Sequence, residues 1–282
     1  MNKITDTFKL ENGVEIPCIG FGTWQSPAGD TTVNAVKAAI GLGYKHIDAA
    51  AVYENQISVG QGIREGGLYR DHLFITSKLW NSERGYKKTL EAFERTISDL
   101  QVDYLDLYLI HWPASSSRFD NWEELNLETW RAMTELYKKG HIRAIGVSNF
   151  MPHHLEALMK TEVKPMVNQI EFHPGYMQSE TVDYCRKNNI LVEAWSPLGS
   201  GRILDNELLK EMADKYNKSV AQVCIRWCLQ NNTLPLPKSI TPARIQENSQ
   251  VFDFTISEED MMKINNMEYA GGSGLDPDKV KF

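Results

Sequence analysis

The sequence predicts an α/β protein folded as one (β/α)8 barrel, a TIM barrel, and three observations support this fold class. From Ile19 onward, eight short apolar segments alternate with segments of helical periodicity along the 282 residues. No linker, composition shift or long repeat interrupts the alternation. The competing doubly wound dinucleotide fold requires a third glycine after Gly20 and Gly22, but Gln25 occupies that position. We therefore expect residues 1–282 to form a single domain.

Each expected strand is an apolar run bounded by turn residues. In chain order the barrel strands are Ile19 to Thr23, Tyr44 to Asp48, Leu73 to Ser77, Tyr104 to Ile110, Ala144 to Val147, Val167 to Ile170, Ile190 to Ala194 and Thr233 to Leu236. Pro235 makes the last strand irregular, because proline has no N–H for a sheet ladder. Before them, Phe8 to Pro17 alternates around Asn12-Gly13, which predicts a β-hairpin that closes the bottom of the barrel.

Apolar residues at helical spacing, together with end signals, predict the helices. These are Asp30 to Gly41, Asn55 to Gly66, Tyr86 to Leu100, Trp122 to Lys139, a helix entered through Pro152, Glu180 to Lys187, Ser219 to Gln230, a helix entered through Pro242, and Glu258 to Met267. We expect Asp30 and Thr241 to cap their helices, and Ser219 with Gln222 to form a capping box.

Composition excludes several classes of function. The protein is 42% hydrophobic and 24% charged, as expected for a globular protein, and its net charge of -7 argues against a general nucleic-acid binder. No apolar run approaches the roughly 18 residues of a membrane helix. The four cysteines form no CxxC pair, so we expect buried thiols and no metal site. We expect a cytoplasmic monomer.

Polar residues follow three successive strands. Asp48, Lys78 and His111 stand at the ends of the second, third and fourth strands, and Tyr53 lies on the segment that begins at Asp48. Each has an ordinary structural explanation when taken alone. In a barrel, however, the C-terminal ends of the strands meet on one face, which carries the active site in enzymes of this fold. Their joint position therefore predicts a catalytic cluster.

Five segments, spread along the chain, carry further motifs. They are Gly43 to Gly60, Ser77-Lys78-Leu79-Trp80, Leu109-Ile110-His111-Trp112-Pro113, Gly146-Val147-Ser148-Asn149-Phe150 and Leu236-Pro237-Lys238-Ser239. In these segments the chain resembles the aldo-keto reductase family over almost its whole length. Their presence together and in order is highly specific. The resemblance implies that Asp48, Tyr53, Lys78 and His111 form a catalytic tetrad.

The chemistry of these side chains agrees with that assignment. A carbonyl oxygen that gains negative charge during hydride transfer needs a hydrogen-bond donor and a proton. We expect Tyr53 to supply the proton as general acid, with Lys78 lowering the pKa of the phenol. Asp48 would hold Lys78 by an ion pair, and a neutral His111 would orient the carbonyl.

The resemblance also implies an NADPH site. Lys238, Ser239 and Arg244 would bind the 2′-phosphate at the N-terminus of a helix, with Asn248 at the adenine end. Three polar side chains, Ser148, Asn149 and Gln169, would bond the nicotinamide carboxamide. Trp195 would stack on the nicotinamide ring, where many relatives carry tyrosine, and Ser196 and Leu198 would lie along the pyrophosphate.

Three tryptophans, Trp24, Trp80 and Trp112, follow strands one, three and four, so we expect them to line an apolar substrate pocket. The loop after Pro113 and the tail 268–282 near the active-site face are short. Both features resemble the bacterial short-loop members, including the 2,5-diketogluconate reductases and prostaglandin F synthase-like proteins. They imply loose specificity for small aldehydes and ketones such as α-dicarbonyls and keto-sugars.

Two other functions compete with carbonyl reduction. Lys78 could form a Schiff base in a barrel lyase, although Asp48 beside it favours a charged lysine. The chain could also be a nucleotide-sensing subunit without turnover, which its complete tetrad and lack of an obvious docking extension argue against.

Overall fold

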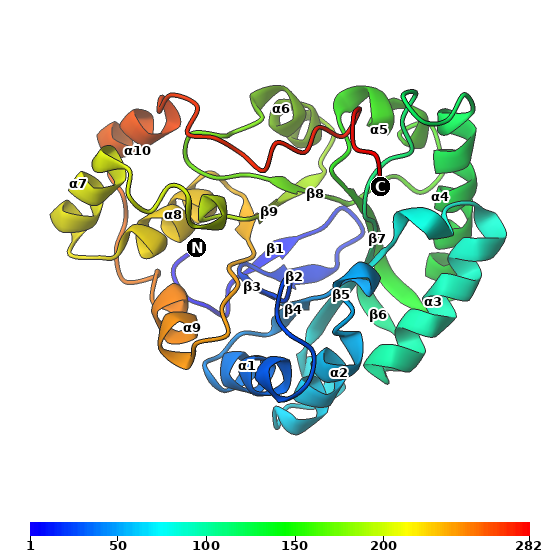
Figure 1. The fold of residues 1–282 in the computed structure, drawn as a ribbon, viewed down its shortest axis with the longest axis horizontal. Helices are drawn as coiled ribbons and strands as arrows, with labels where there is room; N and C mark the ends of the chain where they lie inside the picture. The colour runs from blue at the N-terminus through cyan, green and yellow to red at the C-terminus, as the bar shows by residue number, and fades with distance from the viewer.

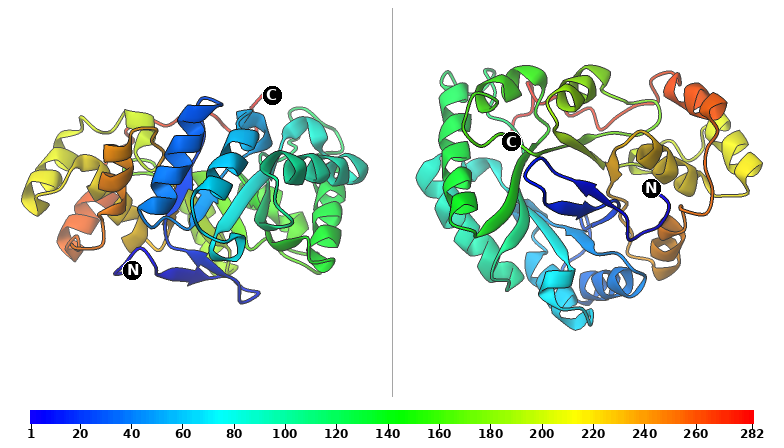
Figure 2. Two further views of the ribbon diagram at one scale, coloured as in Figure 1. Left: turned by 90° about the horizontal axis from the view of Figure 1, so that it is seen from below. Right: turned by 180° about the vertical axis from the view of Figure 1, so that it is seen from behind.

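The computed structural model describes residues 1–282, and a short antiparallel hairpin opens the chain. Strand β1 (Thr7–Lys9) pairs with β2 (Glu15–Pro17), and Gly13 takes a positive φ of 85° in the turn. The hairpin lies across one end of the barrel, away from the C-terminal tail (Figure 2). Leu10 and Ile16 pack there against apolar side chains of the barrel strands. The expected closure of the barrel bottom is confirmed.

Eight parallel strands follow the hairpin, and their order in the sheet is their order in the chain. They are β3 (Gly20–Gly22), β4 (His46–Asp48), β5 (Phe74–Leu79), β6 (Leu105–Ile110), β7 (Ile142–Ser148), β8 (Val167–Glu171), β9 (Leu191–Trp195) and β10 (Leu234–Pro235). The N–H of Gly22 donates to the carbonyl of Pro237 at 3.0 Å, which joins the first strand to the segment just after the last. This arrangement is the predicted (β/α)8 barrel.

Ten helices surround the strands (Figure 1). They are α1 (Asp30–Gly41), α2 (Gln56–Glu65), α3 (Tyr86–Leu100), α4 (Trp122–Lys138), α5 (Pro152–Leu158), α6 (Ser179–Lys187), α7 (Glu207–Tyr216), α8 (Val220–Gln230), α9 (Pro242–Ser249) and α10 (Glu258–Asn265). None of them is both long and apolar enough to cross a membrane. All four cysteines are free and buried, as expected.

Three details of the elements differ from the sequence prediction. Helix α7 was not expected, although Asn206 caps it by accepting a hydrogen bond from the N–H of Leu209. Asp30 is the first residue of α1 and does not cap it; the capping position is Gly29, whose φ is 92°. Thr241 precedes α9 but makes no side-chain cap. The capping box of α8 is confirmed.

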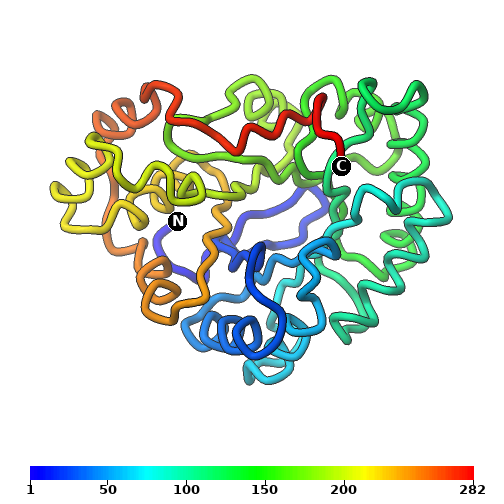
Figure 3. The backbone as a smooth tube through the Cα atoms, viewed as in Figure 1, coloured from blue at the N-terminus to red at the C-terminus, as the bar shows by residue number.

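The C-terminal tail crosses the end of the barrel opposite the hairpin (Figure 3). It contains no helix after α10 and runs over the ends of the strands. Ser273 in the tail is held by Glu171 at the end of β8, to which its hydroxyl donates at 2.7 Å. The tail therefore forms part of the wall around the open end of the barrel.

Candidate functional site

A cavity of about 860 Å³ opens at the C-terminal ends of the strands. All but one of the residues expected in the site line it: Asp48, Tyr53, His111, Ser148, Asn149, Gln169, Trp195, Ser196, Leu198, Lys238, Ser239, Arg244, Asn248, Trp24, Trp80 and Trp112. The exception is Lys78, which lies inside β5 and is fully buried. The barrel therefore brings together residues that are far apart in the sequence.

Lys78 joins the acid and the phenol of the expected tetrad. Its Nζ donates to the two oxygens of Asp48 at 2.9 and 2.7 Å, and to the carbonyl of Ala49 at 3.0 Å. It also lies 3.2 Å from the hydroxyl of Tyr53, which is in a 3₁₀ turn, Ala51–Tyr53, directly after β4. The rings of Tyr53 and His111 meet edge to face, with centroids 5.7 Å apart. The four side chains form one contiguous cluster.

Burial governs the protonation states of this cluster. It raises the pKa of Tyr53, and the charge of Lys78 opposes that rise without cancelling it. Lys78 therefore acts in the predicted direction and lowers the pKa of Tyr53, but burial outweighs it, so the net pKa lies above the ordinary value. Burial alone would lower the pKa of Lys78, but Asp48 and Tyr53 outweigh it and raise the pKa. At neutral pH the cluster thus holds a protonated phenol beside a charged lysine.

His111 is neutral at the same pH. Burial lowers the pKa of His111 well below its ordinary value, and the charge of Lys78 adds to the effect. The edge of Trp80 also packs against His111, with ring centroids 5.2 Å apart. A neutral imidazole can still donate one hydrogen bond into the cavity.

The expected nicotinamide residues bond mainly to one another. Asn149 has a positive φ of 63°, and its Nδ2 donates to the carbonyl of His111 at 3.0 Å. Its Oδ1 accepts from Nε1 of Trp195 at 2.8 Å, so this bond orients the indole in the cavity wall. Ser148 donates to the carbonyl of Gln169 at 2.7 Å. Asn149 also donates to the hydroxyl of Ser148 at 3.1 Å, so its side chain connects His111, Ser148 and Trp195.

The opposite end of the cavity is suited to a phosphate. Arg244 lies in the first turn of α9 and makes no hydrogen bond or ion pair within the protein. Ser239 is at the same end, and Lys238 reaches the carbonyl of Gln25 at 3.2 Å. A free guanidinium beside a helix N-terminus is an established form of anion site. The donors present fit the phosphate end of a dinucleotide.

The sequence analysis did not assign several residues in and around the cavity to the site, and four of them make notable contacts. Phe282 stacks on Trp80 with ring centroids 5.5 Å apart, and Ser273 and Leu275 of the tail also line the cavity. The sequence analysis expected the tail 268–282 near this face but did not identify which of its residues line the cavity. Glu193 is fully buried on β9 and bonds Gln169 at 2.8 Å. An acidic residue inside an apolar strand was a signal that could have identified it.

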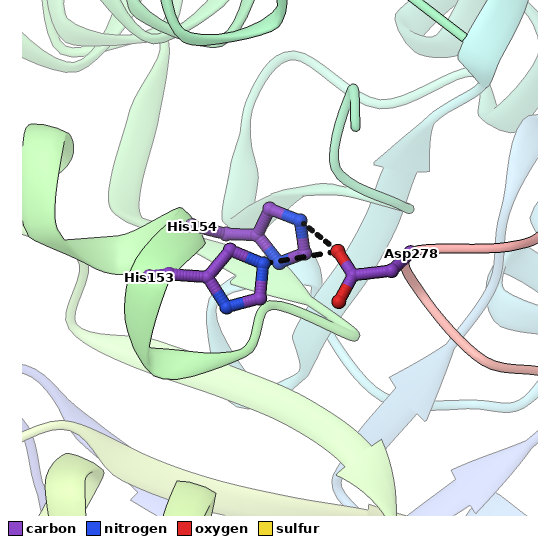
Figure 4. A group of neighbouring side chains, drawn as sticks. All are labelled: His153, His154 and Asp278. Atoms are coloured by element: carbon purple, nitrogen blue, oxygen red, sulfur yellow. Dashed lines mark hydrogen bonds and ion pairs between the residues drawn. The ribbon is translucent and has the colours of Figure 1, made fainter. Parts of the chain in front are cut away.

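A second polar cluster fixes the tail beside the cavity (Figure 4). His153 and His154, at the start of α5, both contact one oxygen of Asp278, at 2.9 and 3.1 Å. Nδ1 of His154 accepts the N–H of Met151, so its Nε2, the nitrogen nearer to Asp278, carries the ring hydrogen. A metal at Nε2 would have to displace this hydrogen. The cluster therefore holds the tail through the hydrogen bond of His153 and the close contact of His154 with Asp278.

Comparisons with known proteins agree with this geometry. Residues 18–268 match the model of the Aldo/keto reductase family. The glyoxal reductase of Bacillus subtilis (strain 168) is 52% identical over 280 residues, covering 99% of this chain and 99% of that protein.

Solved structures give the same result. An aldo-keto reductase from a deep-sea metagenome library has a TM-score of 0.93 and 43% identity, covering 98% of this chain and 100% of that one. A mutant of Gox0644 in complex with NADPH has a TM-score of 0.91 and 41% identity, covering 99% of each chain. The chain belongs to the Aldo/keto reductase family.

Proposed function

We propose that this protein is an NADPH-dependent reductase that converts the carbonyl of small aldehydes and ketones to an alcohol. The observation that carries the proposal is the hydroxyl of Tyr53, which lines the cavity 3.2 Å from the charged Nζ of Lys78. A protonated phenol beside a fixed cation can give up its proton to a developing alkoxide. The cofactor, when bound, supplies the hydride.

The residues of the cluster take distinct parts in this reaction. Tyr53 gives its proton to the carbonyl oxygen, and Lys78 stabilises the negative charge that develops on the phenol. Asp48 keeps Lys78 charged and in place through two hydrogen bonds, at 2.9 and 2.7 Å. The neutral His111 donates a hydrogen bond that orients the carbonyl. A charged Lys78 is also a poor nucleophile, which argues against the Schiff-base alternative.

Two observations support NADPH as the cofactor. The free guanidinium of Arg244 and the nearby Lys238 supply the charge that a 2′-phosphate requires. A related protein of the same fold has been solved in complex with NADPH. Trp195, oriented by Asn149, would offer its flat face to the nicotinamide ring.

Small α-dicarbonyls are the proposed substrates. The relative that is 52% identical is a glyoxal reductase. In this chain Trp80, Trp112 and Phe282 form an aromatic wall, with Phe282 lying 5.5 and 5.3 Å from the two indole rings. Such a wall suits a small compound whose carbonyl groups turn toward Tyr53 and His111. A monomeric state and a cytoplasmic location stay predictions.

NADPH oxidation followed by absorbance tests the proposal, with glyoxal, methylglyoxal, simple aldehydes and keto-sugars as substrates and NADH in parallel. Tyr53→Phe removes the proton donor but keeps the ring, so turnover should fall by about 1,000-fold or more while NADPH still binds. Tyr69→Phe, at an exposed phenol far from the cavity, is the control. A Tyr53→Phe enzyme with the wild-type rate would refute the assignment of the acid.

A further inference from the structure

Glu193 is a second buried carboxyl group in the barrel interior. It lies on β9, is 0% exposed, and is in register with Gln169 on β8 and Leu234 on β10. Its Oε2 accepts a hydrogen bond from Nε2 of Gln169 at 2.8 Å, whereas its Oε1 has no partner. A buried carboxyl group with an unpaired oxygen costs folding free energy that an apolar side chain would not. The proposed mechanism gives this group no part.

Gln169 links Glu193 to the tetrad. Its Nε2 donates to Oδ1 of Asp48 at 2.9 Å as well as to Glu193 at 2.8 Å. A side-chain amide has two N–H donors, and carboxyl groups from β4 and β9 take both. Gln169 lines the cavity, and its side-chain oxygen, Oε1, has no partner in the protein, whereas its backbone carbonyl accepts from Ser148. Because Glu193 and Asp48 bind both N–H donors of Gln169, only its Oε1 remains available to a ligand.

The charge of Glu193 changes within an accessible pH range. Burial, reinforced by the charge of Asp48, raises the pKa of Glu193 to about 8, against smaller opposing effects of Gln169 and Lys78. Asp48 and Lys78 are the charged groups that act on it, and its register partners Gln169 and Leu234 carry no charge. Glu193 is thus mainly a neutral acid at pH 7 and becomes a second negative charge beside Asp48 in alkaline solution.

We propose that Glu193 is a positioning residue for the nicotinamide end of the cavity, where it orients the amide of Gln169 and biases the choice between the two redox forms of the cofactor. This inference rests on the proposed function. The ring of NADP⁺ is positively charged and that of NADPH is neutral, so an ionised Glu193 favours NADP⁺. A neutral Glu193 leaves the charges of Asp48 and Lys78 balanced and does not favour NADP⁺ in this way.

The charge effect is measured by the ratio of the Kd of NADP⁺ to that of NADPH, from tryptophan fluorescence at a mildly acidic and an alkaline pH. Both forms carry the same phosphates, so the ratio cancels the contributions of Lys238 and Arg244. In the wild type the ratio should fall by about tenfold from pH 6.5 to pH 9.5. In Glu193→Gln, which cannot ionise, it should change by less than about twofold. Equal pH dependence in the two proteins would overturn the charge effect.

The orienting effect needs a second variant. Glu193→Gln still offers an oxygen to Gln169, whereas Glu193→Leu offers none, so NADPH should bind about fivefold more weakly to the leucine variant. Thermal unfolding confirms that both variants are folded at the assay temperature. Equal NADPH affinity in the two variants would overturn the orienting role. Failure of the wild type to bind either form would overturn the proposed function itself, which distinguishes that outcome from the other two.

Discussion

At the scale of single residues, Lys78 has the most crowded polar surroundings in the site. Its ammonium group contacts both oxygens of Asp48, the carbonyl of Ala49 and the hydroxyl of Tyr53, all within 3.2 Å. Lys78→Met leaves the carboxylate of Asp48 buried without its cation. We expect this to lower the free energy of unfolding by about 3–5 kcal/mol, measured by urea denaturation.

An exposed ion pair provides the control. Lys37 and Glu65 are also 2.9 Å apart, but their side chains are 40% and 43% exposed. Lys37→Met should cost no more than about 1 kcal/mol. If Lys78→Met and Lys37→Met lower the free energy of unfolding equally, the buried ion pair contributes no more to stability than the exposed one.

The sequence could identify the residues of the site but not their contacts. Asp48, Tyr53 and His111 follow strand ends, which is a pattern in the chain. The net rise in the pKa of Tyr53 was not predictable, because it depends on how deeply the ring is buried. The hydrogen bonds of Asn149 with His111 and Trp195 were likewise not predictable from the sequence, because they join segments that only the closed barrel brings together.

At the scale of elements, prediction succeeded where the hydrophobic pattern was strong. Every barrel strand was expected within a few residues of its observed position, because buried parallel strands are short apolar runs. The residue types that are typical of helix ends predicted the helix caps less well. Asp30 and Thr241 have the right side chains for caps, but neither makes the bond, since cap geometry depends on the entering chain. Helix α7 was missed despite its cap at Asn206.

Helix α9 carries the element-scale prediction. Its first turn presents free N–H groups and the unpaired guanidinium of Arg244 to the cavity. Arg244→Ala should raise the Kd of NADPH by about 10- to 100-fold, and that of NADH by much less, because only NADPH carries the 2′-phosphate. Isothermal titration with both cofactors measures the difference.

A remote arginine serves as the control for that comparison. Arg131 is exposed on α4 and pairs with Glu128 at 2.8 Å, so Arg131→Ala should leave both affinities unchanged. Equal losses of NADPH and NADH affinity in Arg244→Ala would contradict the 2′-phosphate assignment.

At the scale of the whole molecule, the barrel buries several titratable groups in their neutral forms. Burial lowers the pKa of His46 to about 3 and that of His154 to about 4, and it lowers the pKa of His111 as well. Burial raises the pKa of Glu193 to about 8, so this acid also stays in its neutral form at pH 7, although its pKa moves up and not down. Each of these groups makes folding depend on pH.

The sign of that dependence follows from proton counting. Below about pH 6.5 the unfolded chain binds protons on three histidines that the folded protein keeps neutral, so stability falls as the pH falls. Glu193 opposes this, because between about pH 4.5 and 8 the folded protein keeps a proton that the unfolded chain has lost. The histidines outnumber the glutamate, so their effect dominates.

We therefore expect the free energy of unfolding to fall by up to about 3 kcal/mol per pH unit between about pH 6 and 5. Urea denaturation across this range measures the slope. His46→Gln should reduce it by about 1.4 kcal/mol per pH unit, and Glu193→Gln should increase it by a similar amount. An unchanged slope in both variants would mean that these buried groups do not set the acid sensitivity of the barrel.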